Sequence, residues 1–161
     1  MSSDIELSSV ACDLGSVLDD TFTLLRPNLT KNRIVVRTSF ASDLPAVDVS
    51  RAHILQVCLN IVMNAIDAMP DGGNLHVALA PETRRMPGLL IRFSDSGKGI
   101  PAEDLQRIYE PFFTNGKAKG VGLGLTITRD IVERHHGQLV IQSPPGQGAV
   151  VEVWIPLKHE A

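Results

Sequence analysis

The chain has 161 residues, a length typical of one domain with a sizeable core. Its formal net charge is −3 with acidic and basic residues interspersed, which argues against a nucleic-acid-binding protein, because such proteins usually present a basic face. No run approaches the roughly 18 apolar residues of a membrane span, and the first residues lack the pattern of a signal peptide. We therefore expect a cytoplasmic domain in which Cys12 and Cys58 are reduced, buried thiols.

Apolar periodicity predicts helices and strands along the whole chain. Asp13 is expected to cap the first helix and Asp48 or Ser50 the second, while Pro27 predicts a kink or an early end of the first. The expected helices span residues 13–30, the stretch from the second cap to Met69, 102–108 and 123–136. The expected strands span residues 5–7, 33–40, 74–80, 88–95, 138–143 and 149–155. Strands that follow each other directly indicate antiparallel pairing, so the sequence predicts a single α+β layered sandwich over residues 1–161.

Two asparagines lie four residues apart in the apolar second helix. On a helical wheel, Gln56, Asn60, Asn64 and Asp67 fall within roughly 80° of one another, and nearly everything else on the circumference is apolar. Such a narrow stripe fits a helix that is buried on most sides and lines a cleft on one. The alternative is a stripe that only bonds loop backbone, and the stripe alone does not decide between the two.

Three further clusters follow in the sequence. In DSGKGI (residues 95–100), an acid at a strand end and two spaced glycines would let the backbone approach a planar ligand while the carboxylate accepts from an amine; a simple turn is the alternative. The second cluster is PFFT (111–114), whose two Phe rings are consistent with a small anchor in the core. GVGLGL (120–125) opens a helix, where free backbone N–H groups favour a phosphate.

Commoner nucleotide motifs do not fit these glycines. A Walker loop requires Ser or Thr after Gly116-Lys117, where this chain has Ala118. A dinucleotide fingerprint requires a third glycine where Leu125 stands. It also requires an apolar strand directly before the glycines, where this chain has NGKAK (115–119). We read residues 114–122 as a mobile loop.

NIVMNAIDA (60–68), DSGKG (95–99), PFFT and GVGLGL resemble, in order and spacing, four signature boxes of sensor histidine kinases: the asparagine, first glycine, phenylalanine and second glycine boxes. The resemblance extends from about Ile5 to Leu157. It implies the catalytic ATP-binding domain of the Bergerat fold, a two-layer α/β sandwich with a mixed, mostly antiparallel sheet and helices on one face. The phrases NAIDAMPDGG and YEPFFT are most similar to the nitrogen-regulator subgroup.

The resemblance also implies cofactors and residue roles. ATP and Mg²⁺ would be bound, with Asp95 on the adenine amine, Asn64 on Mg²⁺ and Asn60 close to the phosphates or the metal's waters. Residues 114–122 would form the ATP lid, from which Lys117 or Lys119 would reach a phosphate. The full set of implied ATP-binding residues is Asn60, Asn64, Asp67, Asp95, Gly97, Gly99, Ile100, Phe113, Lys119, Gly120, Gly122, Leu123, Gly124 and Leu125.

Other positions depart from the family or separate its branches. Gyrase-like members have a catalytic Glu where Asn60 stands, and the amide of Asn60 cannot act as a general base. We therefore expect slow hydrolysis of ATP, with phosphoryl transfer to a histidine as the productive reaction. Ala149 stands where the family often has Thr, so one polar contact near adenine is expected to be missing. The adjacent His135 and His136 are expected at the surface. No histidine has the Ser-His-Glu-like context of a phospho-acceptor; the five are His53, His76, His135, His136 and His159.

The sequence thus predicts a protein histidine kinase domain, a transferase of phosphorelay signalling. It would pass the γ-phosphoryl group to a histidine on a separate dimerisation segment that is absent here. The expected partners are those helices and a downstream response regulator, with no nucleic acid. We expect this fragment to be a cytoplasmic monomer without membrane contact of its own, within a parent kinase that can be membrane-anchored. Two alternatives stay open: a stand-alone anti-sigma-factor-like serine kinase and a non-catalytic nucleotide-binding regulatory module.

Overall fold

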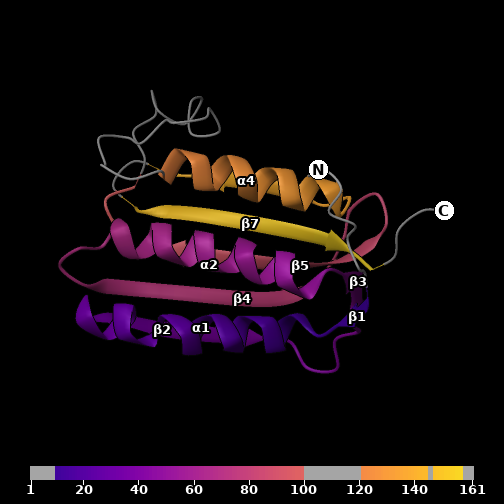
Figure 1. The fold of residues 1–161 in the computed structure, drawn as a ribbon, viewed down its shortest axis with the longest axis horizontal. Coiled ribbons are helices and arrows are strands. Elements are labelled where there is room, and N and C mark those ends of the chain that lie inside the picture. The colour runs from indigo at the N-terminus through magenta and orange to yellow at the C-terminus, as the bar shows by residue number, and fades with distance from the viewer. Residues whose placement is uncertain (1–9, 100–120, 145–146, 158–161) are drawn as a thin grey trace.

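The computed structural model describes residues 10–99, 121–144 and 147–157, without the side chains of residues 121–124. In these ranges a five-stranded sheet is covered on one face by three helices (Figure 1). The predicted two-layer arrangement is therefore confirmed. The strand expected at residues 5–7 and the helix expected at 102–108 lie outside the described residues.

The sheet is mixed and mostly antiparallel, as predicted. Its strand order is β2-β4-β5-β7-β6, and only the β2–β4 pair is parallel. A parallel pair needs a crossover, which here includes α2. The strands are β2 (Ile34–Phe40), β4 (Gly73–Thr83), β5 (Pro87–Asp95), β6 (Gln138–Gln142) and β7 (Ala149–Pro156).

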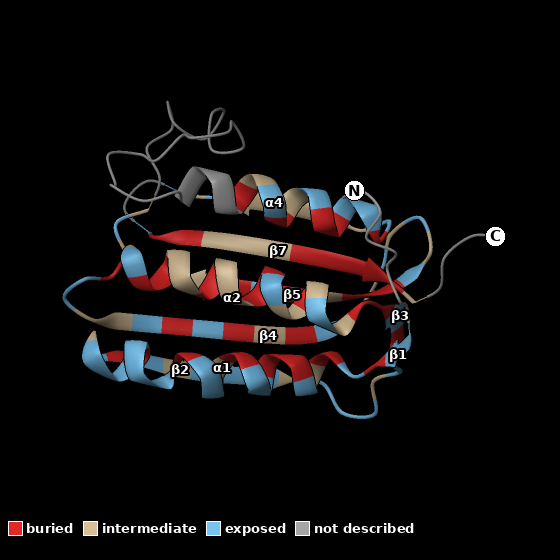
Figure 2. Ribbon diagram, viewed as in Figure 1, coloured by how far each residue is buried: buried red, intermediate tan, exposed pale blue. Residues whose placement is uncertain are grey.

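The core lies between the sheet and its helices. Along β4, Leu75, Val77 and Leu79 are buried in this core, while the intervening His76 is exposed on the other face (Figure 2). No helix in the described ranges is long and apolar enough to span a membrane. The helices are α1 (Leu14–Lys31), α2 (Arg51–Asp67) and α4 (Val121–Arg134).

A second, two-stranded sheet was not predicted. It pairs β1 (Val10–Cys12) with β3 (Val47–Val49) in antiparallel orientation. Strands of three residues are too short to show an alternating pattern in the sequence. The pairing has a clear consequence, because Asp13 and Ser50 follow these two strands directly and the starts of α1 and α2 are brought together.

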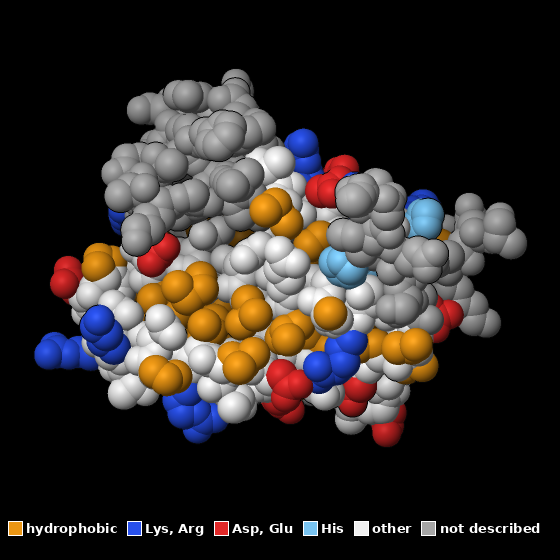
Figure 3. Space-filling view, viewed as in Figure 1, with side chains coloured by type: hydrophobic (Ala, Val, Ile, Leu, Met, Phe, Trp, Pro, Cys, Tyr) orange, Lys and Arg blue, Asp and Glu red, His pale blue; other side chains and the backbone are white. Residues whose placement is uncertain are grey.

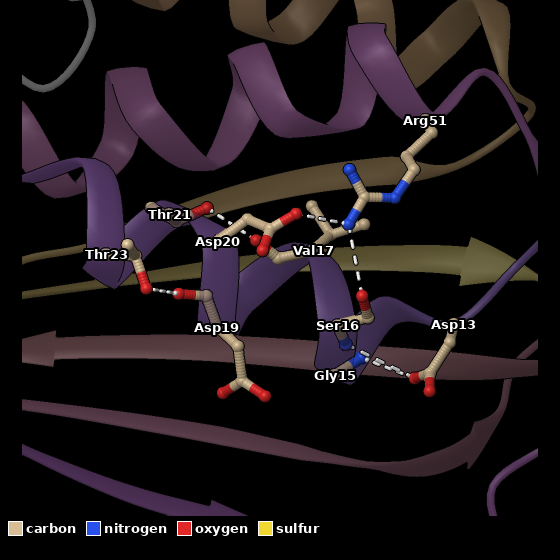
Figure 4. Close-up of polar contacts among 9 residues, drawn as sticks. All are labelled: Asp13, Gly15, Ser16, Val17, Asp19, Asp20, Thr21, Thr23 and Arg51. Carbon is tan, nitrogen blue, oxygen red and sulfur yellow. Dashed lines mark hydrogen bonds and ion pairs between the residues drawn. The ribbon is translucent and has the colours of Figure 1, made fainter.

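Side-chain caps begin both helices. Asp13 Oδ1 accepts from the backbone N–H groups of Gly15 and Ser16 at 2.9 and 3.4 Å (Figure 4). Arg51, the first residue of α2, donates to Ser16 Oγ at 3.1 Å and to Asp20 Oδ2 at 2.6 Å. These contacts tie the two helix starts together.

The cap of α2 is Ser50 rather than Asp48. Its hydroxyl accepts from the backbone N–H of His53 at 3.4 Å. The early end expected at Pro27 is wrong, since α1 continues to Lys31. Leu25 and Leu29 are buried on either side of the proline, and this packing outweighs one lost backbone hydrogen bond.

The ends of α4 also differ from expectation. The helix begins at Val121, so residues 121–122 are helical rather than part of the loop, and it ends at Arg134. The left-handed residue after it is His136, with φ of 65°. Gly137 serves close packing, because a Cβ there would lie 2.3 Å from the carbonyl oxygen of Trp154.

Trp154 lies on the face of the sheet away from the helices. Its neighbours Val153 and Ile155 point into the main core, so the alternation of β7 turns Trp154 to the other side. The ring is nevertheless 0% exposed. Arg84 and Arg85, from the β4–β5 turn, place their guanidinium carbons 5.8 and 5.1 Å from its centroid and cover it.

Candidate functional site

The polar stripe on α2 is present as the helical wheel predicts. Asn60 and Asn64 are half-buried, whereas Gln56 and Asp67 are exposed. The other side of the helix is fully apolar and packs into the core through Ile54, Val57, Cys58, Ile61, Val62, Ala65 and Ile66. The asparagines therefore lie at the border between the core and the surface.

Asn60 joins α2 to α4. Its Nδ2 donates to the hydroxyl of Thr128 at 3.2 Å, and Thr128 is 0% exposed. Thr128 was not predicted as a site residue. The signal was available in the sequence, since Thr128 interrupts the apolar face formed by Leu125, Ile131 and Val132, and a polar group on such a face needs a partner.

Asn64 is in a different situation. Its Nδ2 atom is buried and has no hydrogen-bond partner in the part of the chain described here. A buried amide that stays unpaired costs free energy, on the order of 1–3 kcal/mol. Such an orphaned polar group is expected where a ligand or ordered water completes the hydrogen bonding.

Asp95 ends β5, the central strand of the sheet. Its Oδ1 accepts from the backbone N–H of Gly97 at 2.8 Å and from that of Ala149 at 3.4 Å. Burial raises the pKa of this carboxyl group, and the two N–H donors oppose the rise. Both contacts end on Oδ1, so Oδ2 remains an acceptor for an amine; Ala149 contributes its backbone where the family often has a Thr hydroxyl.

The loop after Asp95 is packed on the end of α2. The backbone N–H of Lys98 donates to the carbonyl of Ala68 at 3.2 Å. A Cβ at Gly97 would lie 2.5 Å from the same oxygen, so only glycine permits this approach. The fold thus places the DSGKG segment against the end of the helix that carries the asparagine stripe.

Gly148 closes the same corner and was not predicted. Its φ is +75°, and a Cβ there would lie 2.0 Å from the carbonyl oxygen of Asp95. Both facts require glycine. The PPGQG turn between β6 and β7 was the only signal for it.

Several predicted site residues are not placed by the structure. Leu125 is placed near the start of α4, and its side chain is buried. The described residues contain no cluster of three His, Cys, Asp or Glu side chains suited to a metal. The predicted residues outside the described residues or side chains are Ile100, Phe113, Lys117, Lys119, Gly120, Gly122, Leu123 and Gly124.

The expected surface position of His135 is wrong, while His136 is exposed. His135 is 0% exposed; its Nδ1 lies 2.9 Å from the carbonyl of Ile131, and its Nε2 accepts from the backbone N–H of Ser50 at 3.1 Å. His135 falls on the same helical face as Ile131 and Val132, which are both buried. Adjacent residues point apart, so only one of the two histidines reaches solvent.

Known proteins share this sequence pattern. Residues 50–159 match the family described as histidine kinase-, DNA gyrase B-, and HSP90-like ATPase. Sporulation kinase E of Bacillus subtilis (strain 168) is 32% identical over 145 residues, which are 90% of this chain and 19% of that protein. Sensor histidine kinase ZraS of Escherichia coli (strain K12) is 33% identical over 151 residues, which are 94% of this chain and 32% of ZraS.

The fold is shared as well. The catalytic domain of histidine kinase ThkA has a TM-score of 0.81 and 27% identity, over 96% of this chain and 100% of that one. ThkA in complex with response regulator protein TrrA gives a TM-score of 0.78 and 26% identity, over 94% of this chain and 42% of that one. This chain spans about a fifth of sporulation kinase E and a third of ZraS. The chain belongs to the histidine kinase-, DNA gyrase B- and HSP90-like ATPase family, as an ATP-binding catalytic domain of the sensor histidine kinase type.

Proposed function

We propose that this domain binds ATP and Mg²⁺ between α2, the loop after β5 and the start of α4. The buried, unpaired amide nitrogen of Asn64 is the observation that carries the proposal. It lies on the same helix whose end, at Ala68, holds the loop of Asp95. A polar group without a partner next to a loop built for close approach is typical of a binding site.

Each residue has a proposed role. Asp95 accepts the adenine amine through Oδ2, while Gly97 and Gly99 shape the adenine pocket. Asn64 contributes its amide oxygen to Mg²⁺, and Asn60 lies close to the phosphates or to waters on the metal. When bound, Mg²⁺ supplies positive charge that neutralises the phosphates. The roles of Ile100, Phe113, Lys119, Gly120, Gly122, Leu123, Gly124 and Leu125, and that of Asp67, rest on the resemblance to the family.

The domain is proposed to transfer phosphate rather than to hydrolyse ATP. Asn60 stands where gyrase-like ATPases have a glutamate, and its amide donates to Thr128. An amide cannot take a proton from an attacking water, so water attack lacks its base. Transfer then depends on positioning of an acceptor, which we propose is a histidine on a dimerisation segment outside these residues.

The wider setting is also a proposal. A response regulator downstream is supported by the complex of the related ThkA with TrrA. Membership of a nitrogen-regulator-like subgroup is supported by the phrases NAIDAMPDGG and YEPFFT. The two buried free cysteines suit a reducing cytoplasm, where ATP is available. We expect the chain alone to be a monomer, and a tight dimer in sedimentation would contradict this.

Calorimetric titration with ATP and ADP, with and without Mg²⁺, tests the binding site. We expect Asp95→Asn to bind both nucleotides about 10- to 100-fold more weakly, because it loses an ionic hydrogen bond to the adenine amine. Asp43→Asn is the matched control; Asp43 is exposed, and its φ of 59° suits asparagine equally. No binding by the unaltered chain would mean that only the fold is inherited.

The transfer step needs a separate experiment. The domain is incubated with labelled ATP and the dimerisation helices of a sensor kinase relative. An acid-labile, base-stable label on the added helices is expected, since phosphohistidine has this stability. Acid-stable label on serine would favour the serine kinase, and nucleotide binding without any label would favour a non-catalytic module.

A further inference from the structure

We propose that Thr128 is a positioning residue that presets the side-chain amide of Asn60 for the metal and phosphate side of the nucleotide site. The proposal rests on the ATP-binding function proposed above. It concerns a residue outside the four sequence motifs, 68 positions after Asn60, which only the fold brings to it. Thr128 does not touch the nucleotide in this proposal and acts through Asn60.

The hydrogen bond fixes which end of the amide points where. Asn60 Nδ2 donates to Thr128 Oγ1 at 3.2 Å. A helical threonine hydroxyl commonly donates to the carbonyl four residues earlier, as Thr21 does to Val17 and Thr23 to Asp19. Such a hydroxyl offers its lone pairs to a donor. With its nitrogen committed to Thr128, Asn60 presents its oxygen on the other side, as an acceptor.

The packing of α2 against α4 does not depend on this bond. Ser50 at the start of α2 donates its N–H to the buried His135 near the end of α4, at 3.1 Å. Ile131 and Val132 on α4 and Ile61 and Val62 on α2 all belong to one apolar core. A valine at position 128 has nearly the same shape as threonine, but without the hydroxyl it could not accept from Asn60.

The two asparagines of the stripe are therefore prepared differently. Asn60 is held by a protein partner, whereas the Nδ2 of Asn64 is buried without one among the described residues. A group that is oriented before binding loses less rotational freedom when the ligand arrives. We infer that the amide of Asn60 is oriented before the ligand binds, whereas the hydrogen bonding of Asn64 Nδ2 is completed only by the ligand.

Thr128→Val tests the proposal, with Thr128→Ser to restore the acceptor and Thr128→Ala as a second variant without it. The first readout is the side-chain amide NMR signal of Asn60, which disappears in Asn60→Asp and so can be assigned. We expect Thr128→Val to shift this signal and speed its hydrogen exchange. Thr128→Ser should keep both close to those of the unaltered chain.

The second readout is the gain in ATP affinity that Mg²⁺ produces, measured by calorimetry. We expect Thr128→Val and Thr128→Ala to lose about 3- to 10-fold of this gain, the size of one neutral hydrogen bond. Binding of ADP without Mg²⁺ should stay unchanged, since it depends on the Asp95 side of the site. Thr21→Val is the matched control: it removes another fully buried hydroxyl, on α1, and should leave the gain intact.

The outcomes separate this proposal from the proposed function. An unchanged Mg²⁺-dependent gain in Thr128→Val would overturn the positioning role, as would an equal loss in Thr21→Val. If the unaltered chain bound no nucleotide, the proposed function would fail, and the amide signal would still decide whether Thr128 orients Asn60. If Thr128→Val left the shift and the hydrogen exchange of the Asn60 amide signal unchanged, the inference would be overturned in either case.

Discussion

The backbone N–H of Ser50 donates to Nε2 of His135 at 3.1 Å, so the cap of α2 is tied to the residue that follows α4. The other ring nitrogen, Nδ1, lies 2.9 Å from the carbonyl of Ile131, which can only accept. The ring therefore donates through Nδ1 and accepts through Nε2, which requires the neutral form. A surface histidine would have no such requirement.

His135→Leu should destabilise the fold by about 2 kcal/mol, because it leaves the buried N–H of Ser50 without an acceptor. Urea denaturation measures the change as a lower midpoint. His76→Gln is the control, as His76 is exposed on the open face of the sheet, and it should change stability by less than about 0.5 kcal/mol. Equal stability of His135→Leu and the unaltered chain would show that water or another acceptor replaces the ring.

Asp95 should make nucleotide affinity sensitive to acid. Burial raises the pKa of Asp95, so its carboxylate takes up a proton at higher pH than an exposed aspartate does. The protonated group no longer accepts ideally from the adenine amine, and ATP affinity should fall as the pH drops through this raised value. Calorimetry across a pH series checks this, and an affinity that stays flat down to the usual range of aspartate would contradict it.

The same residue should have the opposite effect on stability. A raised pKa means that the folded state binds the proton more tightly than the unfolded state, so the contribution of Asp95 to stability falls as the pH rises through the folded pKa. Asp95→Asn should therefore raise the urea midpoint at neutral pH, and the gain should vanish in acid. A lower midpoint of Asp95→Asn at neutral pH would show that the N–H contacts to the carboxylate outweigh its burial.

Both cysteines should resist alkylation in the folded protein. Burial raises the pKa of Cys58 to about 12 and also raises that of Cys12, and only the thiolate reacts. Iodoacetamide labelling followed by mass spectrometry should find both thiols unmodified at neutral pH and both modified in denaturant. An added Ala80→Cys on the exposed face of β4 should be labelled at once and provides the control. Rapid labelling of native Cys12 would show that the β1–β3 corner opens readily.

Gly148→Ala should be among the most damaging single substitutions. Its Cβ would lie 2.0 Å from the carbonyl oxygen of Asp95, and its φ of +75° is strained for alanine. We expect a loss of about 2–4 kcal/mol and weaker nucleotide binding, because Asp95 must shift. Gly15→Ala, in the first turn of α1, would place its Cβ 3.2 Å from Oδ1 of Asp13, a side-chain atom that can shift, and should change stability by no more than about 1 kcal/mol. Similar midpoints for the two variants would contradict the close approach at Gly148.

The sequence predicted the features that depend on residues within a single helix or strand. The stripe of Asn60 and Asn64 follows from the helical period alone, and the cap at Asp13 from its position before an apolar run. Interactions between distant segments were missed. Thr128 and Gly148 gain their importance from Asn60 and Asp95, which are far away in the chain.

The errors have the same origin. Pro27 has a poor local preference for a helix interior, yet the burial of Leu25 and Leu29 carries the helix past it. His135 was judged by its type, whereas its position on the face of Val132 decides its burial. The three-residue strands β1 and β3 have no pattern of their own and exist because they pair.

Hydrophobic side chains are visible over the helical layer in Figure 3, and on α2 the side chains of Leu55, Leu59 and Met63 are half-buried. None of them is a fluorophore, and the single tryptophan, Trp154, lies on the opposite face of the sheet under Arg84 and Arg85. The fluorescence emission of Trp154 should change sharply when the chain unfolds and should stay unchanged when nucleotide binds on the helical side. The fluorescence of Trp154 therefore reports unfolding independently of nucleotide binding, so folding can be monitored while nucleotide is titrated.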